Sequence, residues 1–361
     1  MISILAFVLV LSILILVHEF GHFIVAKKAG VKVEKFSLGF GPVIFSLKRK
    51  DTQYCISLIP VGGYVKMSGD SPSDRLSGEA GEYLSQPVRK RMMIVSAGPA
   101  LNYLLAFFVF WLVFLVGNPV ITTKVGGIMK DYPAQIADIR PGDRIIKVGE
   151  KAVGNWEELT ELIRKAKSET LDLVIRREDK VNIVTVYPKK EKIKNIFGKE
   201  EEVARIGITP SDEIIKIKYP FFEAASLALS KLISLTRLTF KAIFRLLIGG
   251  MALKETVSGP LGIFYVTKFA AEMGIVTLLN LLAVLSASLA IFNILPIPVL
   301  DGGHILFLLI EKFRGKAVSL KTQERITQIG IAALIALMVF VSYNDLVRFQ
   351  IFEKIAHFWR K

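Results

Sequence analysis

Apolar and polar residues are segregated along this chain into long blocks. Four apolar blocks cover residues 2–25, 92–116, 275–297 and 326–343. With a rise of 1.5 Å per residue, a helix of about 20 apolar residues crosses the roughly 30 Å hydrocarbon core of a bilayer. The first block lacks a basic leader and a small-residue cleavage site, so we interpret it as a retained span. The pattern predicts a polytopic α-helical membrane protein with four transmembrane helices.

The segment between the first two blocks has a different pattern. In "KFSLGFGPVIFSLKRKDTQYCISLIPVGGYVKM", residues 35–67, short β-prone runs are separated by Gly and Pro, which is typical of β-hairpins. Residues 26–91 carry 12 Lys or Arg against 6 Asp or Glu. We therefore expect a basic, membrane-associated β-hairpin region after the first span.

A soluble α+β domain is predicted between the second and third spans. Residues 120–210 interleave charges with short strand-like runs, in the order strand, turn, strand, turn, helix and hairpin. A long helical pattern follows at 219–250, where Arg237, Lys241 and Arg245 share one face. This helix either lies in the membrane interface or is partly buried with a solvated basic face, and the pattern leaves both interpretations open.

Composition supports a membrane location. The chain is 52% hydrophobic and its mean hydropathy is +0.48, values typical of a protein with several spans. The formal charge of +15 favours a membrane surface as partner and not nucleic acid, because no nucleic-acid motif is present. Cys55 is the only cysteine, which excludes an intramolecular disulfide and disfavours a cysteine metal site.

Basic loops predict the orientation of the spans. One follows the first span, and the other follows the third and contains Lys312, Arg314, Lys316, Lys321 and Arg325. The positive-inside rule puts both loops in the cytoplasm. Four spans then place both termini and the soluble domain outside.

The first apolar block contains an unusual polar motif. "HEFGH", residues 18–22, is an instance of H-E-x-x-H. On a helix His18 and His22 share one face and can reach one zinc ion, while Glu19 can act as general base on a water molecule that the metal activates. Two buried histidines satisfied by hydrogen bonds would explain this spacing in a soluble helix. Within hydrocarbon a charged side chain costs about 2.5–3.5 kcal/mol, which favours a functional site.

A catalytic zinc usually takes a third protein ligand. Asp301 is the best-placed acid, because Pro296 and Pro298 break the helix just before it and irregular backbone at membrane depth lines a buried or wet cavity. His304 is a competing ligand. Glu272 and Glu311 lie near span ends, where snorkelling or solvent contact explains them.

Five motifs occur in a characteristic order. They are "GFGP" (39–42), "GGYVKM" (62–67), "AGPALNY" (97–103), "SGPLGI" (258–263) and "NILPIPVLDGG" (293–303). Together with HEFGH in the first span, they resemble the site-2 protease family of intramembrane zinc metalloproteases, of the bacterial regulator-of-sigma-E protease type. The resemblance extends over nearly the whole chain.

This resemblance implies roles for particular residues. His18, His22 and Asp301 would bind zinc, Glu19 would be the base, and Asn293 would hold the substrate backbone. Asn293 is equally suited to capping the broken helix. The glycine-rich loop with Gly62 and Gly63 would form a re-entrant β-hairpin that pairs with extended substrate. Asn102 is expected to pack between helices near the site.

The resemblance also covers the soluble domain. "PAQIADIRPGDRIIKV" is similar to the core of a PDZ domain, with "VGGI" (125–128) in place of its carboxylate-binding loop. Such a domain captures a peptide terminus by backbone hydrogen bonds, or here serves as a steric gate that excludes bulky ectodomains. Residues 120–210 have room for one such domain.

The sequence thus predicts a zinc-dependent endopeptidase in the bacterial inner (plasma) membrane that cleaves transmembrane segments of other proteins. An anti-sigma factor and remnant signal peptides are both compatible substrates. An inactive scaffold that recruits partners through its PDZ-like domain is an alternative, and so is a metal transporter, although internal repeats and further intramembrane acids are missing. The expected parts are an N-terminal membrane part (1–116), a PDZ-like domain (117–212), an amphipathic helix with connector (213–274), a C-terminal membrane part (275–345) and a tail (346–361).

Overall fold

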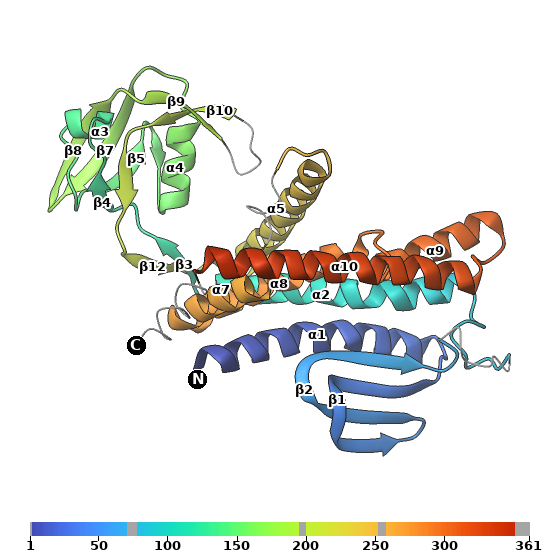
Figure 1. The fold of residues 1–361 in the computed structure, drawn as a ribbon. Helices are drawn as coiled ribbons and strands as arrows, with labels where there is room; N and C mark the ends of the chain where they lie inside the picture. The colour runs from blue at the N-terminus through green and yellow to red at the C-terminus, as the bar shows by residue number, and fades with distance from the viewer. Residues whose placement is uncertain (1, 71–77, 195–199, 252–257, 351–361) are drawn as a thin grey trace, which may run out of the picture. The chain divides into compact units, whose positions relative to one another are not determined.

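The computed structural model describes residues 2–70, 78–194, 200–251 and 258–350, so most of the predicted tail lies outside the described residues (Figure 1). The chain forms two compact units. We call the first the helical unit (residues 1–113, 225–241 and 253–361) and the second the α/β unit (114–224 and 242–252). Each is described here by itself.

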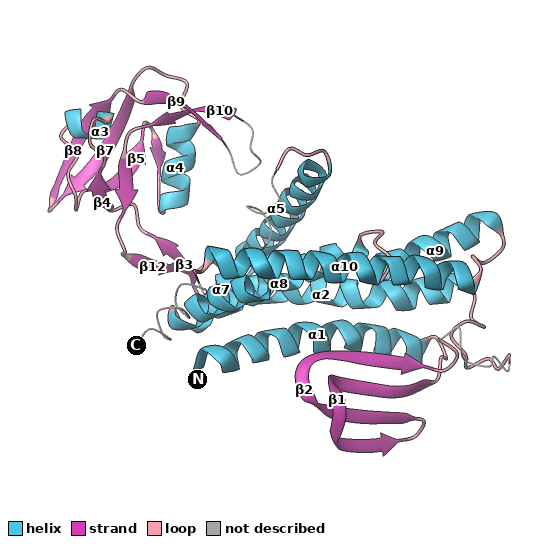
Figure 2. Ribbon diagram, viewed as in Figure 1, coloured by secondary structure: helices cyan, strands magenta, loops and turns pink. Residues whose placement is uncertain are grey.

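Four long apolar helices dominate the helical unit (Figure 2). They are α1 (Ile2–Lys28), α2 (Val88–Val116), α8 (Ile275–Ile294) and α10 (Leu320–Arg348). By length and composition all four could cross a membrane, so the described residues contain as many candidate spans as the sequence predicts. At most 39% of any of their apolar windows is buried within the protein. Apolar helices that expose this much surface are suited to lipid and not to water.

Three further helices lie between the spans in the chain. One is α5 (Phe221–Leu247), which confirms the long helix predicted before the third span. The other two are shorter: α7 (Pro260–Glu272), which packs against α1, and α9 (Asp301–Arg314). The link between α8 and α9 contains Pro296 and Pro298, as the broken-helix prediction requires. Within it Val299 has a φ of 106°, a rare conformation for a β-branched residue. This sharp link sets Asp301 at the first position of α9.

The predicted β-hairpin region forms one irregular antiparallel sheet beside α1 (Figure 1). β1 (Val33–Arg49) and β2 (Thr52–Met67) both bend, so that the sheet has four segments. Residues 33–38 pair on one side with 63–67 and on the other with 53–56, and residues 43–49 pair with 52–57. The segment 63–67 is therefore an edge of this sheet. An edge of this kind can pair with another strand, although the N–H of Met67 already donates to Asp70 Oδ2 at 2.8 Å.

The α/β unit has a small core covered by short strands and two helices. Its helices are α3 (Pro133–Ile136) and α4 (Trp156–Arg164). Its strands are β3 (Asn118–Ile121), β4 (Val125–Ile128), β5 (Arg144–Val148), β6 (Lys151–Ala152), β7 (Leu171–Arg177), β8 (Lys180–Val186), β9 (Lys189–Lys194), β10 (Glu200–Arg205), β11 (Ile208–Pro210) and β12 (Ile214–Ile217). The largest sheet has the order β6-β5-β7-β8. One buried apolar cluster, which contains Ile145, Leu159 and Leu173, joins this sheet to α4.

The first strand predicted in the stretch that opens with VGGI is present: residues 125–128 form strand β4, which pairs with β11. A Cβ atom on Gly126 would lie 2.2 Å from the carbonyl oxygen of Pro210. The glycine therefore permits close approach of the two strands, and its presence in the sequence does not indicate a ligand-binding turn.

A buried ion pair ties the turn before β5 to the end of β7. Asp143 is 1% exposed, and its carboxylate accepts hydrogen bonds from Arg177 Nε at 2.8 Å, Arg177 Nη2 at 2.9 Å and the backbone N–H of Arg140 at 2.8 Å. Burial alone would raise the pKa of the Asp143 carboxyl, but these charge-assisted bonds outweigh it and hold that pKa below its ordinary value.

We expect Asp143→Asn to destabilise the α/β unit by about 2 kcal/mol, because it removes hydrogen bonds between charged groups. Amide hydrogen exchange in β5 and β7 of the full-length protein measures the loss. Asp138→Asn is the matched control, since Asp138 contacts the same arginine from an exposed position and should matter little. Equal effects of the two variants would contradict the assignment.

The same pair gives a pH dependence. A carboxyl whose folded pKa is depressed stabilises the fold above its unfolded pKa, about 3.9 for Asp, and this contribution is lost as the pH falls through the lower folded value. The difference in exchange between wild type and Asp143→Asn should therefore be constant near neutrality and shrink below about pH 4. A difference that persists unchanged in acid would refute this origin.

Candidate metal centre

Helix α1 places the H-E-x-x-H side chains. His18 and His22 lie one turn apart, their rings are 4.9 Å apart at an angle of 80°, and their Nε2 atoms are 3.3 Å apart. The side chains are 12% and 10% exposed. The helical spacing predicted from the sequence thus brings both imidazoles to one point.

Helix α9 adds the predicted carboxylate. Asp301 Oδ2 lies 3.1 Å from His18 Nε2 and 3.5 Å from His22 Nε2. Of the described residues, these three form the one group of possible metal ligands within mutual reach. Zinc–nitrogen and zinc–oxygen bonds of about 2.0–2.2 Å in a tetrahedron put ligand atoms roughly 3.3–3.6 Å apart. Two of the observed separations fall in this range and the third, 3.1 Å, lies just below it, so the spacing is close to that of such a site.

Hydrogen bonding supports the fit. His22 Nδ1 lies 2.8 Å from the carbonyl oxygen of Ile94, which can only accept, so Nδ1 carries the proton of the neutral ring. The lone pair of His22 Nε2 then faces the cluster. Asp301 Oδ2 is buried there without a hydrogen-bond partner among the described residues. The lone pairs of His22 Nε2 and Asp301 Oδ2 therefore face one another with no proton between them, an arrangement that a bound cation stabilises. These residues could hold zinc.

Helix α2 approaches the histidines closely through a glycine. A Cβ atom on Gly98 would lie 2.3 Å from His22 Nε2 and 2.9 Å from His18 Cε1. On the α1 side, a Cβ atom on Gly21 would lie 2.4 Å from the carbonyl oxygen of Ala97. Paired small residues of this kind let membrane helices pack backbone to backbone. The two glycines thus make room for the ligand side chains.

Glu19 lies beside the cluster and next to the edge of the β-sheet. It interacts electrostatically with His18, His22 and Asp301, and its carboxylate bonds to the backbone of Val65. A Cβ atom on Gly63 would come within 3.4 Å of Glu19 Cγ and within 2.8 Å of the Ser37 carbonyl oxygen. A side chain at position 63 would therefore crowd the Ser37 carbonyl oxygen of the neighbouring segment and touch Glu19. Gly62, with a φ of 130°, turns the strand before it reaches this point.

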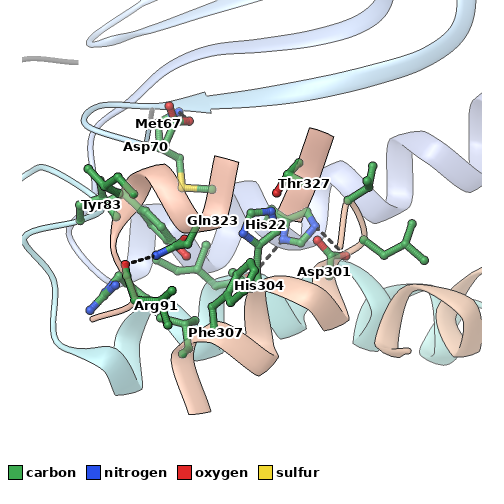
Figure 3. Close-up of a pocket in the computed structure, with 18 of the residues that line it drawn as sticks. His22, Met67, Asp70, Tyr83, Arg91, Asp301, His304, Phe307, Gln323 and Thr327 are labelled. Carbon is green, nitrogen blue, oxygen red and sulfur yellow. Dashed lines mark hydrogen bonds and ion pairs between the residues drawn. The ribbon is translucent and has the colours of Figure 1, made fainter. Parts of the chain in front are cut away.

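A cleft of about 1090 Å³ opens from the cluster. Figure 3 shows His22 and Asp301 toward one end and Tyr83 and Arg91 toward the other. Asn293 and His304 also line it. His304 lies outside the three-residue ligand group, although it is one turn from Asp301. Polar side chains from the first turns of α10 complete the wall: Gln323, Glu324, Thr327 and Gln328.

Glu311 differs from its predicted environment: it is not explained by solvent contact or snorkelling, because its side chain is 17% exposed and it forms an ion pair with Arg91 of α2, which is 10% exposed. Asn102 is buried between helices near the site, as expected, and its amide also lies 3.3 Å from His18 Nδ1. The spacing of residues in the sequence could not predict the Arg91–Glu311 pair or the contact of Asn102 with His18, because each joins helices far apart in the chain. Glu272, with a side chain 60% exposed, matches its prediction.

These features define a class of protein. An H-E-x-x-H helix and a carboxylate from a distant helix, set among apolar helices, are the parts of a membrane metallopeptidase. Comparison with known proteins agrees: the model of Peptidase family M50 matches residues 6–337. The chain belongs to this family, and it is a zinc-dependent membrane metalloendopeptidase.

Relatives match over nearly the full chain. A Clostridium acetobutylicum protein, named provisionally as a zinc metalloprotease, is 34% identical over 94% of this chain and 96% of its own. The zinc metalloprotease RasP of Oceanobacillus iheyensis is 28% identical over 96% of this chain and 99% of its own. The regulator of sigma E protease of Haemophilus influenzae is 27% identical over 95% and 98%.

Among solved structures, the PDZ domain of the SdrC-like protein from Listeria monocytogenes is similar to 26% of this chain. The alignment covers 88% of that domain, with 21% sequence identity and a TM-score of 0.21.

The close approach of α2 gives a direct test of this geometry. We expect Gly98→Ala to weaken zinc binding at least tenfold, a typical effect of disturbing groups around metal ligands, because the added methyl group would overlap His22 Nε2. Zinc titration of the purified protein in detergent measures it. Gly81→Ala is the control, since its nearest contact outside its own neighbours is Lys32 Cβ at 3.6 Å. Wild-type zinc affinity in Gly98→Ala would contradict the site.

Proposed function

We propose that this metallopeptidase cleaves transmembrane segments of other membrane proteins, with His18, His22 and Asp301 as zinc ligands and Glu19 as the general base. One observation carries the proposal: three ligand atoms converge within 3.5 Å of one another, and two of them come from α1, a helix long and apolar enough to cross a membrane. A scaffold needs no such group. A buried cluster of this kind persists where it has a function.

The chemistry follows from the positions of the side chains. The three ligands would hold a zinc ion, which would supply Lewis-acid chemistry for activating water and polarising a carbonyl group. Glu19 lies beside the ligands without belonging to their group, which suits it to take the proton of the attacking water. The same carboxyl then delivers that proton to the leaving amine.

A helical substrate must unwind before its carbonyl groups can be attacked. We propose that the unwound segment pairs with the sheet edge at residues 63–67, which borders Glu19 and the cleft. Strand addition of this kind takes its affinity from backbone hydrogen bonds. Gly62 and Gly63 shape this edge, and the Asn293 amide lines the cleft where it can hold a substrate carbonyl or N–H.

Hydrolysis also needs water at membrane depth. The polar wall formed by α10 and the Arg91–Glu311 ion pair gives the cleft a hydrophilic lining. We propose this side as the route by which water enters. Irregular backbone at the α8–α9 link is tolerated in a membrane protein where it lines such a cavity.

The membrane placement is proposed on charge and exposed surface. The outer sheet exposes Ile44, Phe45, Leu47 and Leu58, each more than half exposed, which suits insertion into lipid. On α5, exposed Leu229, Ile233 and Phe240 lie beside the stripe that begins at Arg237, an arrangement that favours the interfacial interpretation. With basic loops in the cytoplasm, both termini and the α/β unit would be extracytoplasmic in a bacterial inner membrane.

The five-part division of the chain belongs to this proposal, with a PDZ-like domain at 117–212. This domain would either bind a peptide by strand addition or exclude bulky ectodomains. The substrate would be a single-span protein, with an anti-sigma factor or a remnant signal peptide as candidates. The relative from Haemophilus influenzae is named as a regulator of sigma E protease, which fits the first candidate.

The base is tested by Glu19→Gln, which keeps the shape of the side chain and removes its proton-accepting charge. We expect zinc to remain bound and cleavage of a single-span substrate in detergent to fall by about 10²–10⁴-fold, the usual contribution of general acid–base catalysis. Glu272→Gln, on the exposed face of α7, is the matched control. Equal cleavage by both variants at matched zinc content would exclude Glu19 as the base.

Substrate holding is tested by Asn293→Ala. Loss of one hydrogen bond to the substrate backbone should lower kcat/KM by about three- to tenfold, equivalent to roughly 1 kcal/mol, while the zinc affinity is unchanged. Ser288→Ala, one and a half turns earlier on α8, removes a hydroxyl that bonds to its own helix and serves as control. If Asn293→Ala lowers zinc affinity or folding stability instead, Asn293 acts as a helix cap.

A further inference from the structure

Asn102 occupies a special place behind the ligand cluster. It is fully buried on α2, with 0% of its surface exposed. Its amide Nδ2 is placed 3.3 Å from His18 Nδ1, and its Oδ1 is buried without a hydrogen-bond partner among the described residues. Its backbone carbonyl accepts a bond of 2.8 Å from Ser286 of α8. A polar side chain this deeply buried is stable where its hydrogen bonds are made.

The chemistry of a metal-binding histidine decides which amide atom faces His18. A neutral imidazole carries one N–H, and the nitrogen that binds a metal must present its lone pair. Because His18 Nε2 faces Asp301 and His22, its proton belongs on Nδ1, which then needs an acceptor. The Asn102 amide is the partner of Nδ1 among the described residues. An amide N–H pointed at this N–H would repel it.

Rotating the Asn102 amide by half a turn exchanges its oxygen and nitrogen, which have nearly the same shape. The oxygen that is now without a partner then lies where it can accept from His18 Nδ1–H. We propose that Asn102 is a positioning residue that fixes the His18 ring through this hydrogen bond and so presents Nε2 to the metal. The inference rests on the proposed zinc site and deepens it.

The two histidines are then held in the same way. The Ile94 carbonyl oxygen accepts from His22 Nδ1, and Asn102 Oδ1 accepts from His18 Nδ1. Ile94, Gly98 and Asn102 lie at i, i+4 and i+8 on one face of α2. The two acceptor oxygens, of Ile94 and Asn102, thus lie one turn on either side of Gly98, the glycine that lets the α2 backbone approach α1. One stripe of α2 orients both ligands from behind, as outer hydrogen bonds do at many metal sites.

The experiment measures zinc binding and does not depend on proteolysis. Metal-free, full-length protein in detergent is titrated with zinc against a chromophoric chelator. Asn102→Leu keeps the size of the side chain and removes the acceptor, so its zinc affinity should fall by about 10–100-fold. Asn102→Asp keeps an acceptor facing Nδ1–H and should retain affinity close to that of wild type. Ser286→Ala, which removes the bond to the Asn102 backbone alone, should bind zinc normally.

A second readout reports ligand geometry. The visible absorption bands of bound Co²⁺ should shift in Asn102→Leu, where His18 can rotate, and remain unchanged in Ser286→Ala. Wild-type zinc affinity and Co²⁺ bands in Asn102→Leu would overturn the proposal. Equal loss in Asn102→Leu, Asn102→Asp and Ser286→Ala would also overturn it, since the role would then be packing. If wild type itself binds no zinc, the proposed metal site fails and this inference fails with it.

Discussion

Ionisable side chains in apolar surroundings are stable when they are paired or bind a metal, and this constraint governs the helical unit. Two imidazoles and a carboxylate meet among helices that expose apolar surface on their other sides. Their meeting needs α1 to present two histidines on one face and α9 to begin at the acid. It also needs the α8–α9 link to turn sharply, which Pro296, Pro298 and the unusual backbone of Val299 accomplish.

The close contact between α1 and α2 is the second requirement. Lipid gives no hydrophobic drive for helix association, so the helices are held by close packing and hydrogen bonds. Gly21 and Gly98 permit the packing, and the Ile94 carbonyl oxygen supplies a bond that also orients His22. The same contact thus holds α1 against α2 and orients the His22 ring. Substitution of either glycine would act on stability and on the metal site together.

The sequence predicted the elements better than the contacts between them. Apolar length and the H-E-x-x-H spacing are local signals, so the four long helices and the facing histidines followed directly, and the break at Pro296 and Pro298 singled out Asp301. The Arg91–Glu311 pair and the contact of Asn102 with His18 join residues more than 80 positions apart. No periodicity encodes such pairs.

Helix α10 buries little of its apolar surface within the protein. Only 6% of its apolar window is buried within the protein, and its first turns form part of the cleft wall. Its whole length of 29 residues is about 43 Å, whereas its apolar residues 326–343 span about 27 Å, close to the roughly 30 Å hydrocarbon core. The polar first turns that line the cleft would then project beyond the hydrocarbon. One wall of the cleft and a lipid-facing surface are thus successive parts of a single helix.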